Sequence, residues 1–380
     1  MIVLSQFAGT SLWFAGNAVL DQLIVSWQLP ASSLGTVTAA VQLGFIAGTL
    51  VFAFLSIADR FSPPKVFLLC AVTGSLVNAV IVWLPHEYWV LLACRFFTGF
   101  FLAGLYPVGM KIAAGWYRES LGMAIGFLVG ALVLGTAFPH LLVSLDADWP
   151  WSAVMISVSL IASAGGILMY VVVQDGPHLA TGVPFNPAAL SIIFRSAEFR
   201  ASAFGYFGHM WELYAFWVFV PVFVGAHFNL QGVSGDISAW SFIIIASGFF
   251  GSAGGGLLVR RFTSARVAAW QLSASGVCCL LSPLMFIAPT PIFLAYMLFW
   301  GITVIGDSPQ FSTLNAMTAP RQYVGSALTI ANCIGFSVTI VSIYLVEMLI
   351  EMSGVRFALL VLVVGPLFGL ASMRSLLKKP

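Results

Sequence analysis

Charged residues are scarce in this sequence: they make up 7% of its 380 residues, whereas hydrophobic residues make up 60%. A water-soluble domain of this length needs more polar surface than such a composition supplies, which excludes a soluble globular protein. The mean hydropathy of +1.02 points the same way. We therefore expect the surroundings of the folded chain to be mostly lipid.

Motifs for catalysis and for bound cofactors are also lacking. The sequence contains no metal-ligand spacing, no nucleophile-elbow serine, no intramembrane metalloprotease motif and no phosphate-binding loop. Its five cysteines all fall within apolar runs, which favours small buried hydrophobic residues over a disulfide or a metal site. We therefore expect no enzyme, no cofactor, no metal, no nucleic-acid partner and no direct drive by ATP.

Hydrophobic runs of about 20 to 25 residues dominate the chain, and this is the length that a helix needs to cross a bilayer. The runs do not alternate with period two, so a membrane β-barrel is not expected. The first run begins almost at once, without a basic leader or a small-residue cleavage site, so no removable signal peptide is expected. The sequence predicts an all-α membrane protein with twelve transmembrane helices, at 3–24, 33–57, 65–84, 88–113, 121–144, 151–173, 201–225, 238–259, 267–288, 292–316, 325–347 and 355–375.

The positions of the basic residues predict the orientation, because short cytoplasmic loops collect Lys and Arg. With the N-terminus inside, twelve of the fifteen fall in cytoplasmic loops or tails: Arg60, Lys65, Arg118, Arg195, Arg200, Arg260, Arg261, Arg266, Arg321, Arg374, Lys378 and Lys379. We therefore expect a multi-pass protein of the bacterial inner membrane with both termini in the cytoplasm.

The chain divides into two related halves. The longest polar segment, QDGPHLATGVPFNPAALSIIFRSAEFR at 174–200, predicts a cytoplasmic linker between six-helix bundles at 1–173 and 201–380. DRFSPPKV (59–66) aligns with RRFTSARV (260–267), and GFFLAGLYP (99–107) aligns with GITVIGDSP (301–309) at nearly the same offset. Such a parallel repeat of six helices is typical of a transporter whose substrate binds at the midplane between halves that rock.

Three motifs resemble the major facilitator superfamily of transporters. ADRFSPPK (58–65) is similar to the family's signature loop between helices 2 and 3, although Leu55 and Ser62 replace its two glycines and Pro63 replaces a base. LLACRFFTGFF (91–101) is similar to the fourth-helix signature through Arg95, Thr98 and Gly99. WYRESLGMAIGFLVGALVLGTAFP (116–139) resembles the loop into a glycine-rich fifth helix. The resemblance implies two pseudo-symmetric six-helix bundles and secondary transport by alternating access.

The resemblance also implies a conformational latch in the loop at 58–65. In related transporters the acid that corresponds to Asp59 contacts the start of helix 11 and a base after helix 4, which here is Arg118. A carboxylate at a helix N-terminus is stabilised by the helix dipole. We predict a latch made by Asp59, Arg60 and Arg118; the alternative is a loop whose charges only set the topology.

Ionisable residues inside the spans are expected to carry the mechanism, because a charge in hydrocarbon is costly and normally faces a cavity or a partner. Glu212 lies midway along the seventh span, and His209, three residues earlier, projects from the same face. A carboxyl group shielded from water can exchange a proton near neutral pH. We predict proton coupling by Glu212, His209 and Asp307. The alternatives are a fixed hydrogen-bonded brace at Glu212 and backbone capping by Asp307 beside its proline.

Arg95 in the fourth span suits an anionic group on a substrate or the acid of a coupling pair; a static ion pair and snorkelling are its alternatives, and Lys111 can also snorkel. Uncharged polar residues in other spans either bind substrate or bridge helices. The predicted substrate-binding residues are Arg95, Gln42, Tyr106, Tyr214 and Asn332.

These features predict a monomeric secondary transporter that moves a small organic anion together with protons. The nitrate branch of the family is not favoured, because its members carry an arginine on each of helices 2 and 8, and neither span has one here. Proton-driven export of drugs or metabolites is the alternative transport function. A membrane sensor or assembly factor that does not transport is the alternative from another class.

Overall fold

The computed structural model describes residues 1–30, 32–117, 121–146, 149–179, 185–187 and 189–378. All regular elements of these residues are helical. The chain forms two compact units, Met1–Pro184 (unit 1) and Phe185–Pro380 (unit 2), and the boundary between them lies within the segment 174–200. An all-helical membrane fold is therefore confirmed, while a cytoplasmic linker stays a prediction.

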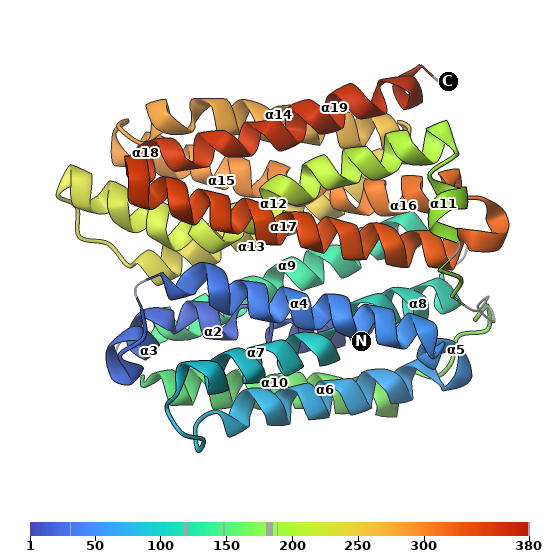
Figure 1. Ribbon diagram of the computed structural model, residues 1–380, viewed down its shortest axis with the longest axis horizontal. Coiled ribbons are helices and arrows are strands. Elements are labelled where there is room, and N and C mark those ends of the chain that lie inside the picture. Colours follow the sequence, from blue (N-terminus) through green and yellow to red (C-terminus); the bar gives the residue numbers. More distant parts are fainter. Residues whose placement is uncertain (31, 118–120, 147–148, 180–184, 188, 379–380) are drawn as a thin grey trace. The chain divides into compact units, whose positions relative to one another are not determined.

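Unit 1 is built from ten helices of its described residues: α1 (Ile2–Thr10), α2 (Ala15–Ala18), α3 (Leu20–Trp27), α4 (Ser33–Phe54), α5 (Ile57–Arg60), α6 (Pro63–Val80), α7 (Tyr88–Leu102), α8 (Tyr106–Trp116), α9 (Leu121–Leu145) and α10 (Trp151–Val172). Within this unit α4 packs against α7 and α6 packs against α10 (Figure 1). Helix α1 lies against α9 and α10.

The described part of unit 2 contains α11 (Ala189–Ile193), α12 (Ala197–Gln231), α13 (Ile237–Leu258), α14 (Ser264–Met285), α15 (Thr290–Gly306), α16 (Ser308–Thr318), η1 (Arg321–Tyr323), α17 (Val324–Ser353), α18 (Val355–Ala358), η2 (Leu359–Val363) and α19 (Val364–Leu377). The long helix α12 packs against α17, α19 and the pair α15 and α16 (Figure 1). It therefore brings side chains of several helices toward its own buried face.

Eleven helical segments of the described residues are long and apolar enough to cross a membrane, and they correspond to eleven of the twelve predicted spans. The prediction of one continuous helix at 3–24 is wrong, because the backbone leaves the helical path at 11–14. The Arg95 guanidinium donates to the carbonyl oxygens of Leu12 at 2.9 Å and Trp13 at 2.6 Å. These carbonyls are thus satisfied without a continuing helix. A crossing by this first segment stays a prediction.

The fourth and tenth predicted spans are interrupted at corresponding places of the sequence repeat. Helix α7 gives way to α8 just before Pro107, and α15 gives way to α16 just before Pro309. A proline has no N–H to donate and its ring clashes with the preceding turn, so it is disfavoured inside a helix but fits the first turn of a new one. Pro139, Pro221 and Pro283 nevertheless lie inside continuous helices, so the breaks at these two places also depend on their surroundings.

Close helix packing repeats as well. A Cβ atom at Gly99 would clash with the Val41 carbonyl oxygen, and one at Gly301 would clash with that of Ile244. Only glycine allows backbones to approach so closely, so α4 with α7 and α13 with α15 are equivalent pairs.

The ends of the segment 174–200 are attached to their own units. In unit 1, the Trp116 indole donates to the Gln174 carbonyl at 3.0 Å, and the His178 amide donates to the Gly115 carbonyl at 2.9 Å. In unit 2, the Asn186 amide donates to the Ser326 hydroxyl at 3.1 Å. Helix α12 begins at Ala197, inside the predicted linker, so less of this segment is free of regular structure than expected.

Candidate functional site

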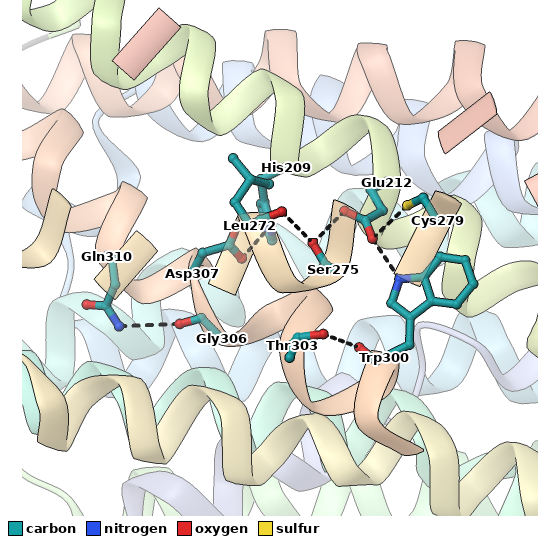
Figure 2. Close-up of polar contacts among 10 residues, drawn as sticks. All are labelled: His209, Glu212, Leu272, Ser275, Cys279, Trp300, Thr303, Gly306, Asp307 and Gln310. Carbon is teal, nitrogen blue, oxygen red and sulfur yellow. Dashed lines mark hydrogen bonds and ion pairs between the residues drawn. The ribbon is translucent and has the colours of Figure 1, made fainter. Parts of the chain in front are cut away.

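Two acids and a histidine lie buried within unit 2, on α12 and at the break between α15 and α16. His209 Nδ1 on α12 lies 2.8 Å from Asp307 Oδ1, and each of the two side chains is 1% exposed (Figure 2). Asp307 Oδ2 and His209 Nε2 have no hydrogen-bond partner among the described residues. This pair therefore keeps an open acceptor and an open ring nitrogen.

The backbone break positions Asp307 for this contact. Its side chain does not cap α16; its backbone carbonyl instead accepts from the amides of Gln310 at 3.0 Å and Phe311 at 2.9 Å. The alternative that the Asp307 carboxyl only satisfies backbone groups at the proline kink is therefore wrong. The carboxyl group is directed toward α12.

Glu212, one turn beyond His209 on α12, accepts three hydrogen bonds from neighbouring helices. Its Oε1 accepts from Trp300 Nε1 at 2.7 Å and from Cys279 Sγ at 3.3 Å, and its Oε2 accepts from Ser275 Oγ at 2.9 Å (Figure 2). Glu212 is 1% exposed, and no basic side chain contacts it among the described residues. A buried carboxyl group without a positive partner can become neutral by taking up a proton.

His209 and Glu212, which are both predicted to take part in proton coupling, have separate partners in the structure. A spacing of three residues on one helix places both side chains on one broad face, but His209 turns to Asp307 and Glu212 turns to α14 and α15. The cluster therefore contains two separate acidic centres, which we call the Asp307 centre and the Glu212 centre.

The partners of Glu212 were not predicted from the sequence. Ser275 and Trp300 have no distinguishing pattern around them, and Cys279 is predicted only as a small buried residue. These residues lie on helices far from Glu212 in the sequence, so no spacing rule connects them. An acid within an apolar span indicates that hydrogen-bond donors must lie nearby, because buried polar groups are normally hydrogen-bonded. It does not indicate which residues supply them.

Arg95 is fully buried in unit 1, where it contacts neutral acceptors rather than an acid. Besides the carbonyls of Leu12 and Trp13, it donates to Asn78 Oδ1 at 2.8 Å, and the Asn78 amide in turn donates to Ser159 Oγ at 3.0 Å. No acid pairs with Arg95 among the described residues. The alternatives of a static ion pair and of snorkelling are therefore wrong, and the positive charge of Arg95 is not neutralised locally.

The loop acid Asp59 forms an ion pair with Lys111, a base that was not predicted as part of the latch. Lys111 on α8 pairs with Asp59 and also donates to the Ala58 carbonyl at 2.7 Å. Arg118 lies outside the described residues, and Arg60 is exposed. The side chains of Lys111 and Asp59 are 23% and 28% exposed, and Lys111 joins the predicted latch as an observed partner of Asp59.

We expect Asp59→Asn to change the ratio of inward-facing to outward-facing protein by up to about fivefold, since partly exposed ion pairs contribute about 0.2–1 kcal/mol. Folding should remain intact. State-specific cysteine labelling measures the ratio, and Lys111→Gln should give the same change without adding to it. Unchanged labelling in both variants would mean that the charges of this loop only set the membrane topology.

The other predicted substrate-binding residues are distributed over both units. Gln42 is buried on α4, and Tyr106 begins α8. Tyr214 is buried among aromatic rings on α12, and Asn332 Oδ1 accepts from the Tyr206 hydroxyl at 3.2 Å. Their part in substrate binding stays a prediction.

Comparison with known proteins identifies the fold. A sequence model described as Major Facilitator Superfamily matches residues 2–343. Comparison with curated protein sequences gives no match. Among solved structures, the human organic anion transporter MFSD10 (TETRAN) is 14% identical with a TM-score of 0.71, and the alignment covers 98% of this chain and 99% of that chain.

Two further structures share this fold at similarly low identity. The proton:xylose symporter XylE is 15% identical, with a TM-score of 0.70 and coverage of 98% and 94% of the two chains. The transporter FucP, in an outward conformation, is 15% identical, with a TM-score of 0.69 and coverage of 98% and 97%.

Proposed function

The chain belongs to the major facilitator superfamily, and from this premise we propose that it is a secondary transporter that moves a small organic anion with protons by alternating access. Membership makes it a multi-pass membrane transporter rather than an enzyme. The substrate, the coupled ion, a monomeric state and a bacterial inner membrane with both termini inside are parts of the proposal.

The Glu212 centre is the observation that carries proton coupling. Glu212 is buried near the middle of a membrane-spanning helix, is held by three donors and lacks a basic partner among the described residues. Burial of a charge in hydrocarbon is costly, so an acid kept there without a permanent cation is suited to carry a proton in part of the cycle. The Asp307 centre, with its histidine, supplies a second group that can exchange a proton.

The unneutralised charge of Arg95 supports an anionic substrate. Its guanidinium is buried among neutral oxygen atoms, and its Nε has no hydrogen-bond partner among the described residues. A positive charge in a low-dielectric environment attracts an anion much more strongly than one in water does. The related structures transport substrates of different kinds, so the substrate class rests on Arg95 and not on those relatives.

We expect organic anions, and not sugars or organic cations, to stabilise the purified protein. A ligand at 100 times its dissociation constant should add about 2.7 kcal/mol to the free energy of unfolding, which a thermal-shift screen detects. The ligands found should then accumulate in proteoliposomes when a pH gradient is imposed. Stabilisation by cations alone would favour drug export, and absence of counterflow with every ligand class would favour a sensor that does not transport.

A further inference from the structure

Ser275 on α14 has one hydroxyl proton and two acceptors within reach. Its Oγ lies 2.9 Å from Glu212 Oε2 and 3.2 Å from the carbonyl oxygen of Leu272, one turn earlier on the same helix (Figure 2). Ser275 is 1% exposed, so bulk water does not compete for these bonds. A hydroxyl group donates one hydrogen bond and accepts others, and it rotates to suit its partners.

We propose that Ser275 is a positioning residue for proton exchange at Glu212, and that its hydroxyl turns between Glu212 and the Leu272 carbonyl as Glu212 changes its charge. This inference rests on the proposed proton coupling by Glu212. It assigns to a neutral serine the task of keeping the acid hydrogen-bonded in both of its protonation states.

The change of partner balances atom by atom. When Glu212 is ionised, the Ser275 hydroxyl donates to Oε2, and the indole of Trp300 and the thiol of Cys279 donate to Oε1. When a proton from water binds Oε2, the new O–H group donates to Ser275 Oγ, and the serine proton turns to the Leu272 carbonyl. No bond of serine breaks, and the donors to Oε1 are unchanged.

The partners of Oε1 cannot perform this task. An indole N–H only donates, so Trp300 supports either state of Oε1 but cannot accept a proton from Oε2. Cys279 is a weak donor on the same side of the carboxyl group. The hydroxyl of Ser275 is the group among the described contacts of Glu212 that both donates and accepts strongly.

Other titratable groups lie near Glu212 and can influence its protonation. His209 lies on its own helix, and the groups on facing helices are Cys278, Cys279, Tyr296 and Asp307. Tyr296 donates to the Cys278 carbonyl at 2.8 Å, and Asp307 contacts His209. None of these five groups donates a hydrogen bond to Oε2 in the described part of the chain, so a change at Ser275 acts on that oxygen first.

The test is a pH titration of the Glu212 carboxyl band by infrared spectroscopy, on the full chain in liposomes. The band is assigned by its loss in Glu212→Gln. A hydrogen bond to a charged group is stronger than one between neutral groups, so Ser275→Ala should shift the equilibrium toward the protonated carboxyl by about tenfold. Ser275→Thr keeps the hydroxyl and should stay within about twofold of the wild type.

Ser282→Ala is the matched control, because Ser282 is a fully buried serine on the same helix whose hydroxyl donates to the Cys279 carbonyl at 2.9 Å. It should leave the titration unchanged. If Ser275→Ala does not fold, Ser275→Cys, with its weaker donor, should shift the equilibrium in the same direction. An unchanged titration in the alanine or cysteine variant, or an equal shift in Ser275→Thr, would overturn the role of the hydroxyl.

This measurement is independent of the proposed function, because it needs no substrate and no transport. A titration that depends on the Ser275 hydroxyl supports the inference even if a pH gradient never drives uptake; in that case only the proposed coupling fails. Conversely, if uptake depends on the gradient but Glu212 titrates identically in wild type and Ser275→Ala, the coupling stands and the inference is wrong.

Discussion

Glu212→Gln should abolish substrate accumulation driven by a pH gradient while leaving exchange down a substrate gradient largely intact. A proton carrier must be charged in one step and neutral in another, which a carboxyl group can do and an amide cannot. Exchange requires no net movement of protons, so it should survive. The measurement is uptake into proteoliposomes with and without an imposed gradient, with a ligand found by the thermal-shift screen.

The hydrogen-bond partners of Glu212 explain why a glutamine at this position should remove proton exchange without disturbing the fold. A glutamine carbonyl can accept from Trp300 as Oε1 does, and its amide group can donate to the Ser275 hydroxyl, which then turns to the Leu272 carbonyl. The variant should therefore fold and bind substrate. Only the capacity to gain and lose a proton is removed.

Glu198→Gln is the matched control, since Glu198 is an exposed acid in the first turn of the same helix. It should keep accumulation near the wild-type level. If the Glu212 variant still accumulated substrate in response to the gradient, the coupling role would pass to Asp307, and Asp307→Asn should then uncouple. If pH had no effect on the wild type, the protein would be a facilitator or would use another ion.

Arg95→Met should destabilise the protein by on the order of 3 kcal/mol or more, because it leaves several buried acceptors without donors. The guanidinium satisfies the carbonyls of Leu12 and Trp13 and the amide oxygen of Asn78, and all three contacts are 2.9 Å or shorter. Each buried acceptor left without a partner costs about 1–3 kcal/mol. Thermal or denaturant unfolding of the purified protein measures the loss.

Arg95→Lys separates the charge from the geometry. A lysine keeps the positive charge but presents a single ammonium group instead of a planar fork, so it should recover only part of the stability. If the charge attracts the substrate, this variant should still be stabilised by organic anions, whereas the methionine variant should not. Lys65→Gln, which removes an exposed cation of the same unit, should change stability by less than about 0.5 kcal/mol. An Arg95→Met variant as stable as this control would contradict the inference that the Arg95 guanidinium satisfies these buried acceptors.

The amino-acid sequence by itself determined the membrane character of the chain and most of its helices. Length and apolarity are properties of single segments, so eleven of the predicted spans are found as helices. The interruptions before Pro107 and Pro309 do not follow from the sequence alone, because Pro139, Pro221 and Pro283 lie inside continuous helices. The buried position of Glu212 and His209 follows from their place within a long apolar run.

The tertiary structure alone decided which polar groups meet. Spacing on α12 places His209 and Glu212 on one face, but their partners, Asp307 and Trp300, come from another part of the chain. The same holds for Arg95, whose contacts with the Leu12 and Trp13 carbonyls stabilise the interruption of the helix at 11–14, where the sequence has no proline. Hydropathy fixes the depth and length of a helix, whereas the rotation of one helix against another selects hydrogen-bond partners, and that rotation is set by the packing of the whole unit.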